Sequence, residues 1–325
     1  MREPNFENLV KILDKKKPDR PTLFELFINN TINEILSGQK AKSFWDCSWN
    51  YEMIIPAMKK AGYDYATMHG ADFGFPSKEK ISDMKTLREH KFIDPLNCDY
   101  SRLERAEKLL PKGMKIIVFG SGGVLENVIT LVGYENLCIA LYDDPEFVCA
   151  IFKEVGERFA AYYEKCLSYD CVGAIISNDD WGFNTSTMIS VDDMKKYVFP
   201  YHKKIVEVAH KHGRQAILHS CGNLEKINDY IINDLKYDGK HSYEDVICPV
   251  EEMYNKYKGR IAVLGGIDLD YLCRKTPAEI EKRCSDLMKK VETGYALGSG
   301  NSIADYVPYE NYAAMIKVVN KEFEL

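Results

Sequence analysis

Several kinds of segment are missing from this chain of 325 residues. No run of about 18 consecutive apolar residues occurs, so a membrane-spanning helix is not expected. The first residues carry acidic side chains and no apolar core, so we expect a cytoplasmic rather than a secreted protein. The net charge is −6, whereas nucleic-acid binders usually carry a basic excess, so neither a nucleic acid nor an anionic membrane is expected as a partner.

Linkers and cofactor fingerprints are missing as well. No Gly/Ser/Pro-rich stretch or low-complexity tract divides the chain, so we expect a single domain over residues 1–325. Residues 26–30, after the first predicted strand, contain no glycine, which argues against a dinucleotide-binding fold. The ten cysteines follow no repeating spacing, which indicates free thiols in a reducing compartment, such as the cytoplasm of an anaerobe, rather than disulfides.

The sequence does contain a regular alternation of short strands and longer amphipathic helices. Helical periodicity runs through residues 193–212, with Ser190 as N-cap, and through residues 278–292, after Pro277. Such alternation implies a parallel sheet, and eight repeats favour a (β/α)8 barrel of the α/β class over an open sheet. Residues 5–16 are predicted as an N-terminal helical extension that caps the other end of the barrel. The predicted strands are residues 22–27, 65–69, 115–119, 172–177, 215–219, 237–241, 261–264 and 295–297.

The strongest candidate for a metal site follows the fifth predicted strand. In such barrels the working groups lie at the carboxyl ends of the strands. His219 and Cys221 are two residues apart, so in an extended backbone their side chains point to the same side. An imidazole and a thiolate suit zinc, which needs at least one further ligand from the protein. The alternative is a barrel-interior histidine beside a buried cysteine.

Acidic residues and a histidine also end the strands on either side of the fifth. Asp179 and Asp180 follow the fourth strand and can ligate a metal, orient His219, or act as acid or base. For at least one of them the alternative is a cap on the next segment. His241 and Glu244 follow the sixth strand, either as substrate-binding groups or as a structural pair.

Two glycine-rich loops also follow strands. Residues 120–123 open a helical stretch and can bind an anion at its N-terminus, and residues 294–302 allow a ligand to approach the backbone. Neither is a P-loop, because no Gly-Lys-Ser/Thr follows. Plain turns are the alternative for both.

Five segments together resemble the uroporphyrinogen decarboxylase superfamily over nearly the whole chain, and within it the corrinoid-linked methyltransferases. This resemblance implies a (β/α)8 barrel with zinc at the His-x-Cys motif, where it activates a methyl donor or acceptor. The segments are Pro21-Thr22-Leu23-Phe24-Glu25, Asp179-Asp180-Trp181-Gly182, Leu218-His219-Ser220-Cys221-Gly222, Leu264-Gly265-Gly266-Ile267-Asp268, and the ending from Gly298-Ser299-Gly300-Asn301 to Pro308-Tyr309-Glu310-Asn311-Tyr312.

The chain departs from the true decarboxylases at the positions that read porphyrinogen carboxylates. Residues 26–30 lack the expected arginine pair, Met68-His69-Gly70 stands where an acidic residue is expected, and Asn301 replaces a histidine. A barrel that faces many carboxylates without cations would bind them badly, so that activity is not expected. Enzymes that methylate coenzyme M take a third zinc ligand from a cysteine where Asn301 stands, which puts coenzyme M in doubt as the acceptor.

The resemblance implies a zinc-dependent methyltransferase that moves a methyl group between a small methyl ether or methylamine and a corrinoid (cobalamin). The corrinoid is expected on a separate protein, because no Asp-x-His-x-x-Gly signature is present. A metal-free decarboxylase or lyase acting on a non-porphyrin substrate is the alternative, and a non-catalytic binding barrel is a third. Besides the zinc ligands His219 and Cys221, the candidate site residues are Asp180, Glu25 and His241 for catalysis, His69, Asn301, Asp179 and Glu244 for substrate binding, and Glu25, Asp180 or Glu244 as a further metal ligand.

Overall fold

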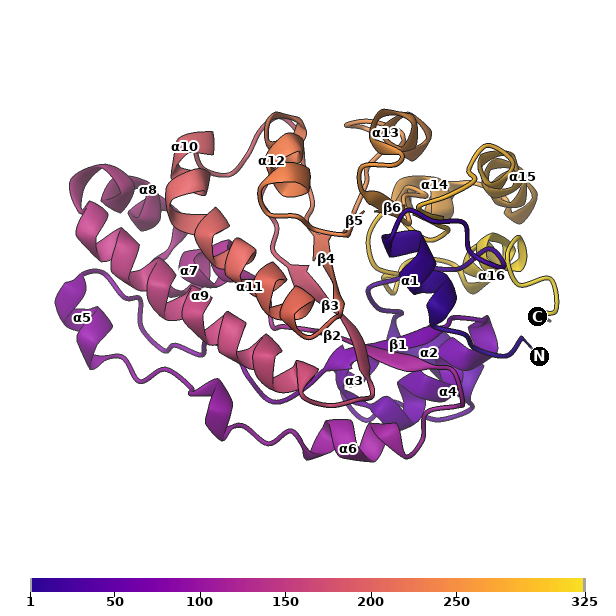
Figure 1. The fold of residues 1–325 in the computed structure, drawn as a ribbon, viewed down its shortest axis with the longest axis horizontal. Coiled ribbons are helices and arrows are strands. Elements are labelled where there is room, and N and C mark those ends of the chain that lie inside the picture. The colour runs from indigo at the N-terminus through magenta and orange to yellow at the C-terminus, as the bar shows by residue number, and fades with distance from the viewer. Residues whose placement is uncertain (1, 324–325) are drawn as a thin grey trace.

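A computed structural model describes residues 2–323 as a curled parallel sheet with helices packed outside it (Figure 1). The strands follow one another in chain order, and each is parallel to its neighbour. Nearly all of their side chains are buried, as is typical of a parallel sheet covered on both faces. The strands are β1 Tyr65–His69, β2 Lys115–Phe119, β3 Val172–Asn178, β4 Gln215–His219, β5 Gly239–His241, β6 Ala262–Leu264 and β7 Tyr295–Ala296.

The helices connect consecutive strands and flank both ends of the chain. Three short elements among them are not α-helical: η1 and η3 are 3-10 turns, and η2 is a π-helix. The helical elements are α1 Glu7–Leu13, α2 Asn30–Ser37, α3 Asp46–Trp49, α4 Tyr51–Ala61, α5 Met84–Glu89, η1 Pro95–Asn97, α6 Ser101–Glu107, α7 Val124–Val132, α8 Tyr134–Asp143, α9 Pro145–Leu167, α10 Val191–Asp193, η2 Met194–Val198, α11 Phe199–Lys211, η3 Glu225–Ile227, α12 Asn228–Asn233, α13 Val250–Tyr257, α14 Leu269–Arg274, α15 Pro277–Met288 and α16 Tyr309–Lys317.

The sheet has seven strands where the sequence predicted eight, and the difference lies in residues 22–27. This segment makes only a single bridge to the end of β7, between Leu23 and Leu297. On its other side the Tyr65 hydroxyl of β1 accepts from the Glu25 amide at 2.7 Å and donates to the Glu25 carbonyl at 3.0 Å. Because the Tyr65 side chain occupies both backbone groups of Glu25, residues 22–27 form no backbone ladder with β1. The segment still lies between β7 and β1.

The other seven predicted strands and the two predicted helical stretches are present, most of them with shifted ends. Strands β1, β2 and β4 have the predicted bounds, and the remaining strands differ by one or two residues. Ser190 caps its helix, since its hydroxyl accepts from the Asp193 amide at 3.1 Å, but the π-helix η2 interrupts the stretch predicted as continuous. Helix α15 ends at Met288, four residues before the predicted end at Glu292.

Helix α1 packs against the amino ends of the strands. Phe6, the N-cap residue, lies over Gly173 at the start of β3, where a Cβ would stand 2.5 Å from the aromatic ring. A Cβ on Gly239, the first residue of β5, would stand 2.7 Å from the Leu13 side chain. One end of the sheet is therefore closed by apolar packing, and the loops at the carboxyl ends are left to form a site.

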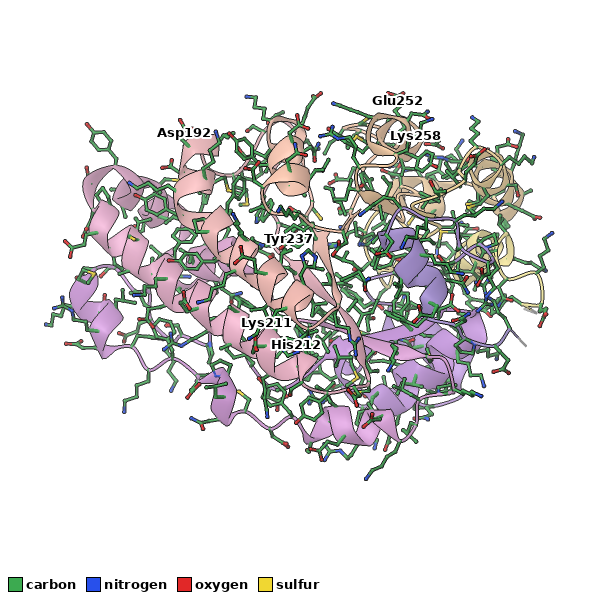
Figure 2. The ribbon with its side chains drawn as sticks, viewed as in Figure 1. Asp192, Lys211, His212, Tyr237, Glu252 and Lys258 are labelled. Carbon is green, nitrogen blue, oxygen red and sulfur yellow. The ribbon has the colours of Figure 1, made fainter. Side chains whose placement is uncertain are left out.

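The outer layer next to β3 and β4 is built from α9 and α11, which pack against each other. Lys211 and His212 at the end of α11 both contact the Glu164 carboxylate of α9, each at 3.1 Å (Figure 2). Beneath this layer His202 of α11 contacts the Tyr237 hydroxyl at 2.8 Å. These contacts fix the helices behind the strands that carry the candidate site.

Within residues 2–323 no single helix has the length and apolar composition needed to cross a membrane. Helices α7 and α8 reach that length and composition only as a pair, with a bend of 95° between them.

Candidate active site

Three neighbouring strands bring their last residues to one edge of the sheet. Asn178 of β3 is in register with His219 of β4, which is in register with His241 of β5. The pairing continues beyond the strands, because the Asp179 amide donates to the His219 carbonyl at 2.9 Å. The polar residues that follow these strands therefore meet at the carboxyl edge, where parallel sheets with helical connections bind their ligands.

The loops after β3 and β4 lie directly against each other. The Cys221 amide donates to Asp180 Oδ1 at 2.8 Å. A Cβ on Gly222 would stand 2.2 Å from the Gly182 carbonyl oxygen, and Gly222 has a φ of +88°, which favours glycine. The glycines of the two sequence motifs thus allow the contact that holds Asp180 beside Cys221.

Asp180, His219 and Cys221 form a compact cluster, which we call the metal cluster. One ligand atom from each lies within 4.8 Å of the other two. Carboxylate, imidazole and thiolate all bind zinc, and three protein ligands with an open fourth position are typical of catalytic zinc. The donor set therefore fits a zinc ion. Of the three candidates for a further ligand, all within the described chain, Asp180 is the one that joins the cluster.

Burial sets the protonation of the two sequence-predicted ligands. It lowers the pKa of His219 to about 4, so this imidazole is neutral near pH 7 and has a lone pair to offer. Burial, assisted by the charge of Asp180, raises the pKa of the Cys221 thiol to about 12. A metal cation next to the sulfur stabilises the thiolate, so cation binding and loss of the thiol proton are linked.

His241 orients His219 through a chain of hydrogen bonds. Nδ1 of His219 is 2.8 Å from Nδ1 of His241, and Nε2 of His241 is 3.2 Å from the Ser299 carbonyl oxygen. Because a carbonyl only accepts, His241 carries its proton on Nε2 and accepts from His219 through Nδ1. This assignment leaves the lone pair of His219 on Nε2, which is 3.9 Å from Cys221 Sγ. His241 is fully buried and orients His219. Its predicted catalytic role stays a prediction.

Glu25, predicted as catalytic or as a ligand, is fully buried behind these contacts. The Ser299 amide donates to one carboxyl oxygen at 2.6 Å, and the Ser299 hydroxyl lies 2.5 Å from the other. That hydroxyl is also 2.5 Å from the Asn301 carbonyl, which can only accept, so the second proton must come from Glu25. Burial raises the pKa of Glu25 to about 8, in agreement with a neutral carboxyl. Glu25 supports the Ser299 loop and does not reach the metal cluster.

Asp179 is also separated from the site, although it precedes Asp180. Its carboxylate accepts from the Leu125 and Glu126 amides, both at 2.9 Å, at the start of α7. Nε2 of His202 contacts the same carboxylate at 2.8 Å, and Asp179 is fully buried. Asp179 therefore caps the start of α7. That it binds substrate stays a prediction.

Two side chains donate hydrogen bonds to the cysteine sulfur. Nδ2 of Asn301 and Oγ of Ser242 each lie 3.2 Å from Cys221 Sγ. Such bonds stabilise a negatively charged sulfur. Ser242 was not predicted, although it directly follows the last residue of β5. Glu244 instead accepts from the Gly222 amide at 3.2 Å and lines a separate cavity of about 160 Å³.

Glu126 is a second residue that sequence reasoning missed. It lines a cavity of about 300 Å³ into which His219 and Asn301 also face. Burial, followed by the charges of Asp179 and Asp180, raises the pKa of Glu126 to about 8. The available signal was its place in the first turn of the helix that follows a glycine-rich loop.

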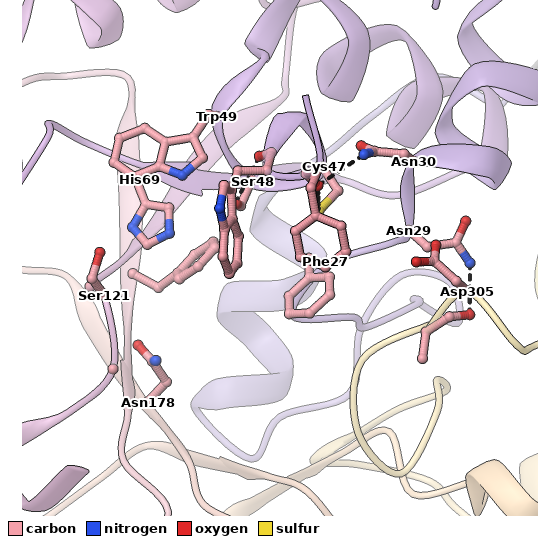
Figure 3. Close-up of a pocket in the computed structure, with 16 residues that line it drawn as sticks. Phe27, Asn29, Asn30, Cys47, Ser48, Trp49, His69, Ser121, Asn178 and Asp305 are labelled. Atoms are coloured by element: carbon pink, nitrogen blue, oxygen red, sulfur yellow. Dashed lines mark hydrogen bonds between the residues drawn. The ribbon is translucent and has the colours of Figure 1, made fainter. Parts of the chain in front are cut away.

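A larger cavity of about 860 Å³ lies beside the smaller one, and we call it the aromatic chamber (Figure 3). The two cavities share Phe27, Asn178 and Ala304 in their walls, so they are neighbours. His69, predicted to bind substrate, lines the aromatic chamber together with Asn178 and opposite Phe27 (Figure 3). The full lining consists of Phe27, Asn29, Asn30, Phe44, Trp45, Cys47, Ser48, Trp49, His69, Phe119, Gly120, Ser121, Gly122, Asn178, Ala304 and Asp305.

Comparison with known families gives one match over most of the chain. The model of the uroporphyrinogen decarboxylase family matches residues 50–322. A protein described as uroporphyrinogen decarboxylase, from Anaeromyxobacter sp. (strain Fw109-5), is 23% identical over 189 residues, which are 58% of this chain and 52% of that protein. The chain thus spans about half the length of the curated relative that it matches.

Solved structures with the same fold include two described as methyl-transferring proteins. A methyltransferase from Methanosarcina mazei matches with a TM-score of 0.73 at 13% identity, over 99% of this chain and 100% of that one. A B12-independent methionine synthase from Shewanella sp. W3-18-1 matches with a TM-score of 0.52 at 12% identity, over 93% and 96% of the two chains. At such low identity these matches show a shared fold.

Proposed function

This chain belongs to the uroporphyrinogen decarboxylase family, and we propose that it is a zinc-dependent methyltransferase. The methyl group moves between a small methyl ether or methylamine and the corrinoid of a separate protein. The observation that carries this proposal is the metal cluster of Asp180, His219 and Cys221, which borders a cavity large enough for a substrate. The fold shared with a methyltransferase from Methanosarcina mazei supports the same reaction class.

The residues of the chain prepare the site for a poor methyl donor, whose leaving group is too basic to depart unaided. A bound zinc ion would supply Lewis acidity at the heteroatom that carries the methyl group. His219 presents Nε2 because His241 holds its other nitrogen. Asp180 is held by the Cys221 amide through Oδ1 and can offer Oδ2 to a cation. Asn301 and Ser242 stabilise negative charge on the cysteine sulfur.

The walls of both cavities are unsuited to a porphyrinogen with many carboxylates. Among residues 2–323, neither the aromatic chamber nor the smaller cavity is lined by an arginine or a lysine. Buried carboxylates need charge-assisted partners, and the carboxylate of Asp305 in the wall of the aromatic chamber would repel them. Decarboxylation of a porphyrinogen is therefore not the activity that we propose.

The metal content of the protein tests this proposal. Protein purified without oxygen and supplemented with zinc is expected to hold close to one zinc ion per chain by elemental analysis. Cys221→Ala should lose that zinc, whereas Cys149→Ala, at an exposed position of α9, should keep it. If the zinc-supplemented wild-type protein contained no zinc, the Lewis-acid mechanism would be contradicted and a metal-free lyase would be favoured.

A further inference from the structure

We propose that the aromatic chamber binds the ring of an aromatic methyl ether that also carries a hydrogen-bond donor, such as a methoxyphenol. The methyl group in this inference rests on the proposed methyl transfer. The ring site itself stands on contacts that do not involve the metal cluster.

The walls of the aromatic chamber suit a flat apolar ring. Phe27, Phe44, Trp45, Trp49 and Phe119 all line it. Aromatic walls of this kind attract rings by stacking and edge-to-face contact, in addition to the gain from simple burial. Its volume of about 860 Å³ lies within the range typical of sites for larger organic ligands. Methanol or a methylamine would leave most of these walls in contact with water, which is unfavourable.

His69 gives the chamber a hydrogen-bond acceptor with no partner inside the protein. Its side chain is only 7% exposed. One ring nitrogen bonds to the Phe119 backbone, and Nδ1 is buried without a partner. Trp49 stacks on the imidazole at a centroid distance of 4.3 Å and an angle of 17°, which fixes the plane of the ring. A buried polar atom without a hydrogen-bond partner is unfavourable, so a ligand that pairs with it gains affinity.

Two amide oxygens in the lining repeat this pattern. Oδ1 of Asn30 and Oδ1 of Asn178 are buried without a partner. The orientation of Asn30 is fixed, because its Nδ2 donates to the Ser43 and Phe44 carbonyls, both at 2.9 Å. The unpaired atoms all accept, so the ligand that completes them must donate. A hydroxyl group on the ring meets this requirement, whereas a carboxylate does not.

The shared walls connect the ring site with the metal cluster. Phe27, Asn178 and Ala304 border both the aromatic chamber and the cavity that contains His219 and Asp180. A substituent on a ring in the chamber can pass this boundary toward the cluster. The methoxy oxygen of the ligand is therefore assigned to the metal side, and its hydroxyl group to the side of His69.

Calorimetric titration of the zinc-supplemented protein with four compounds tests the inference. Guaiacol, an ortho-methoxyphenol, offers both ring and donor, methoxybenzene lacks the donor, methoxycyclohexane lacks the flat ring, and trimethylamine lacks both. Guaiacol is expected to bind about three- to tenfold more tightly than methoxybenzene. Methoxybenzene should exceed methoxycyclohexane by a similar factor, about threefold or more. Equal affinity for guaiacol and methoxycyclohexane would overturn the inference.

The variant His69→Phe tests whether Nδ1 of His69 is the acceptor for the ligand's hydroxyl group. His69→Phe keeps an aromatic ring against Trp49 but removes Nδ1, so guaiacol should bind no better than methoxybenzene, while methoxybenzene itself is unaffected. Tyr142 is 89% exposed and lies outside the chamber lining, so Tyr142→Phe is the control and should change neither affinity. An unchanged preference for guaiacol in His69→Phe contradicts the assignment. If that variant does not fold, the order of the four compounds on the wild-type protein decides alone.

Failure of this inference can be told apart from failure of the proposed function. Cys221→Ala should lose zinc yet keep its preference for guaiacol. If the protein binds no zinc but prefers guaiacol, the ring site is supported and the proposed methyl transfer is contradicted. If it binds zinc and hydroxocobalamin but not guaiacol, the ring site is contradicted, because the aromatic chamber then binds the face of the corrin ring.

Discussion

The metal cluster and the aromatic chamber lie next to each other and differ in whether their polar atoms have hydrogen-bond partners within the protein. Around the cluster His219, His241 and Ser299 satisfy one another, and Asn301 and Ser242 bond to the Cys221 sulfur. In the chamber the acceptor atoms of His69, Asn30 and Asn178 have no partner. A satisfied network holds ligand atoms in one geometry, as an ion requires. Unpaired acceptors on apolar walls select an organic ligand by what it can donate.

The largest expected effect of a single change separates the two neighbouring aspartates. Asp180→Asn removes a metal ligand, so zinc affinity should fall by more than about 100-fold, beyond the loss typical of outer contacts. Competition with a chromophoric chelator measures it. The preference for guaiacol over methoxybenzene should stay unchanged, because Asp180 does not line the aromatic chamber.

Asp179→Asn is the matched control for that prediction. It removes charge from the cap of α7, so the free energy of unfolding should fall by about 2 kcal/mol. Zinc affinity per folded protein should not change. The reverse result, with zinc lost from Asp179→Asn and kept in Asp180→Asn, would contradict the assignment of the cluster.

His241 should matter to zinc without touching it. His241→Phe removes the acceptor that fixes the tautomer of His219, and zinc affinity is expected to fall by about 10- to 100-fold. His241→Gln restores an acceptor and should recover part of the loss. A merely structural role would instead lower the free energy of unfolding equally in both variants and leave the ratio of their zinc affinities at one.

Glu25 should make stability depend on pH. Its folded pKa of about 8 lies above the usual value of 4.5, so the folded protein holds a proton that the unfolded chain releases. This stabilisation is complete below about pH 4.5 and is lost as the pH rises through about 8. The free energy of unfolding should therefore fall by about 3 kcal/mol between about pH 6 and about pH 9, and less in Glu25→Gln. Chemical denaturation at both pH values measures it, and equal slopes in the two proteins would contradict a neutral Glu25.

The smallest expected effect lies at the rim of the aromatic chamber. Trp45 is 63% exposed and lines the chamber, so Trp45→Leu should weaken guaiacol about threefold through lost ring contact and leave zinc affinity unchanged. Tyr142→Leu is the matched control on a distant surface. Calorimetry on both variants checks the difference, and a zinc affinity that falls with Trp45 would show that the two regions are not independent.

Much of the fold was predictable because parallel strands leave a strong local pattern. Buried apolar runs separated by helices gave seven of the eight predicted strands, three of them with the observed bounds. The missing one, residues 22–27, has the composition of a strand. Its pairing partner toward β1 is the side chain of Tyr65, and no local pattern reveals such a contact.

The candidate site was predictable only where spacing along one strand decides the geometry. His219 and Cys221 are two residues apart at the end of one strand, so their side chains point to the same face of the sheet. Asp179 and Asp180 carry the same chemistry at adjacent positions, yet one caps α7 and the other joins the cluster. Which of them does so depends on where the start of α7 lies, and that is set by the packing of distant segments.

The sequence by itself determined the alternation of elements, the end of the sheet that carries chemistry, and the pair His219 and Cys221, because each depends on neighbours along the chain. Tertiary structure alone decided that buried Glu25 supports the Ser299 loop and that His241 orients His219. It also decided that Ser242 and Glu126 face the site. It also decided that His69 is left with an unpaired acceptor in the aromatic chamber. The physical reason is that burial and hydrogen-bond partners come from residues far apart in the chain, and these two factors set which polar atoms remain for a ligand.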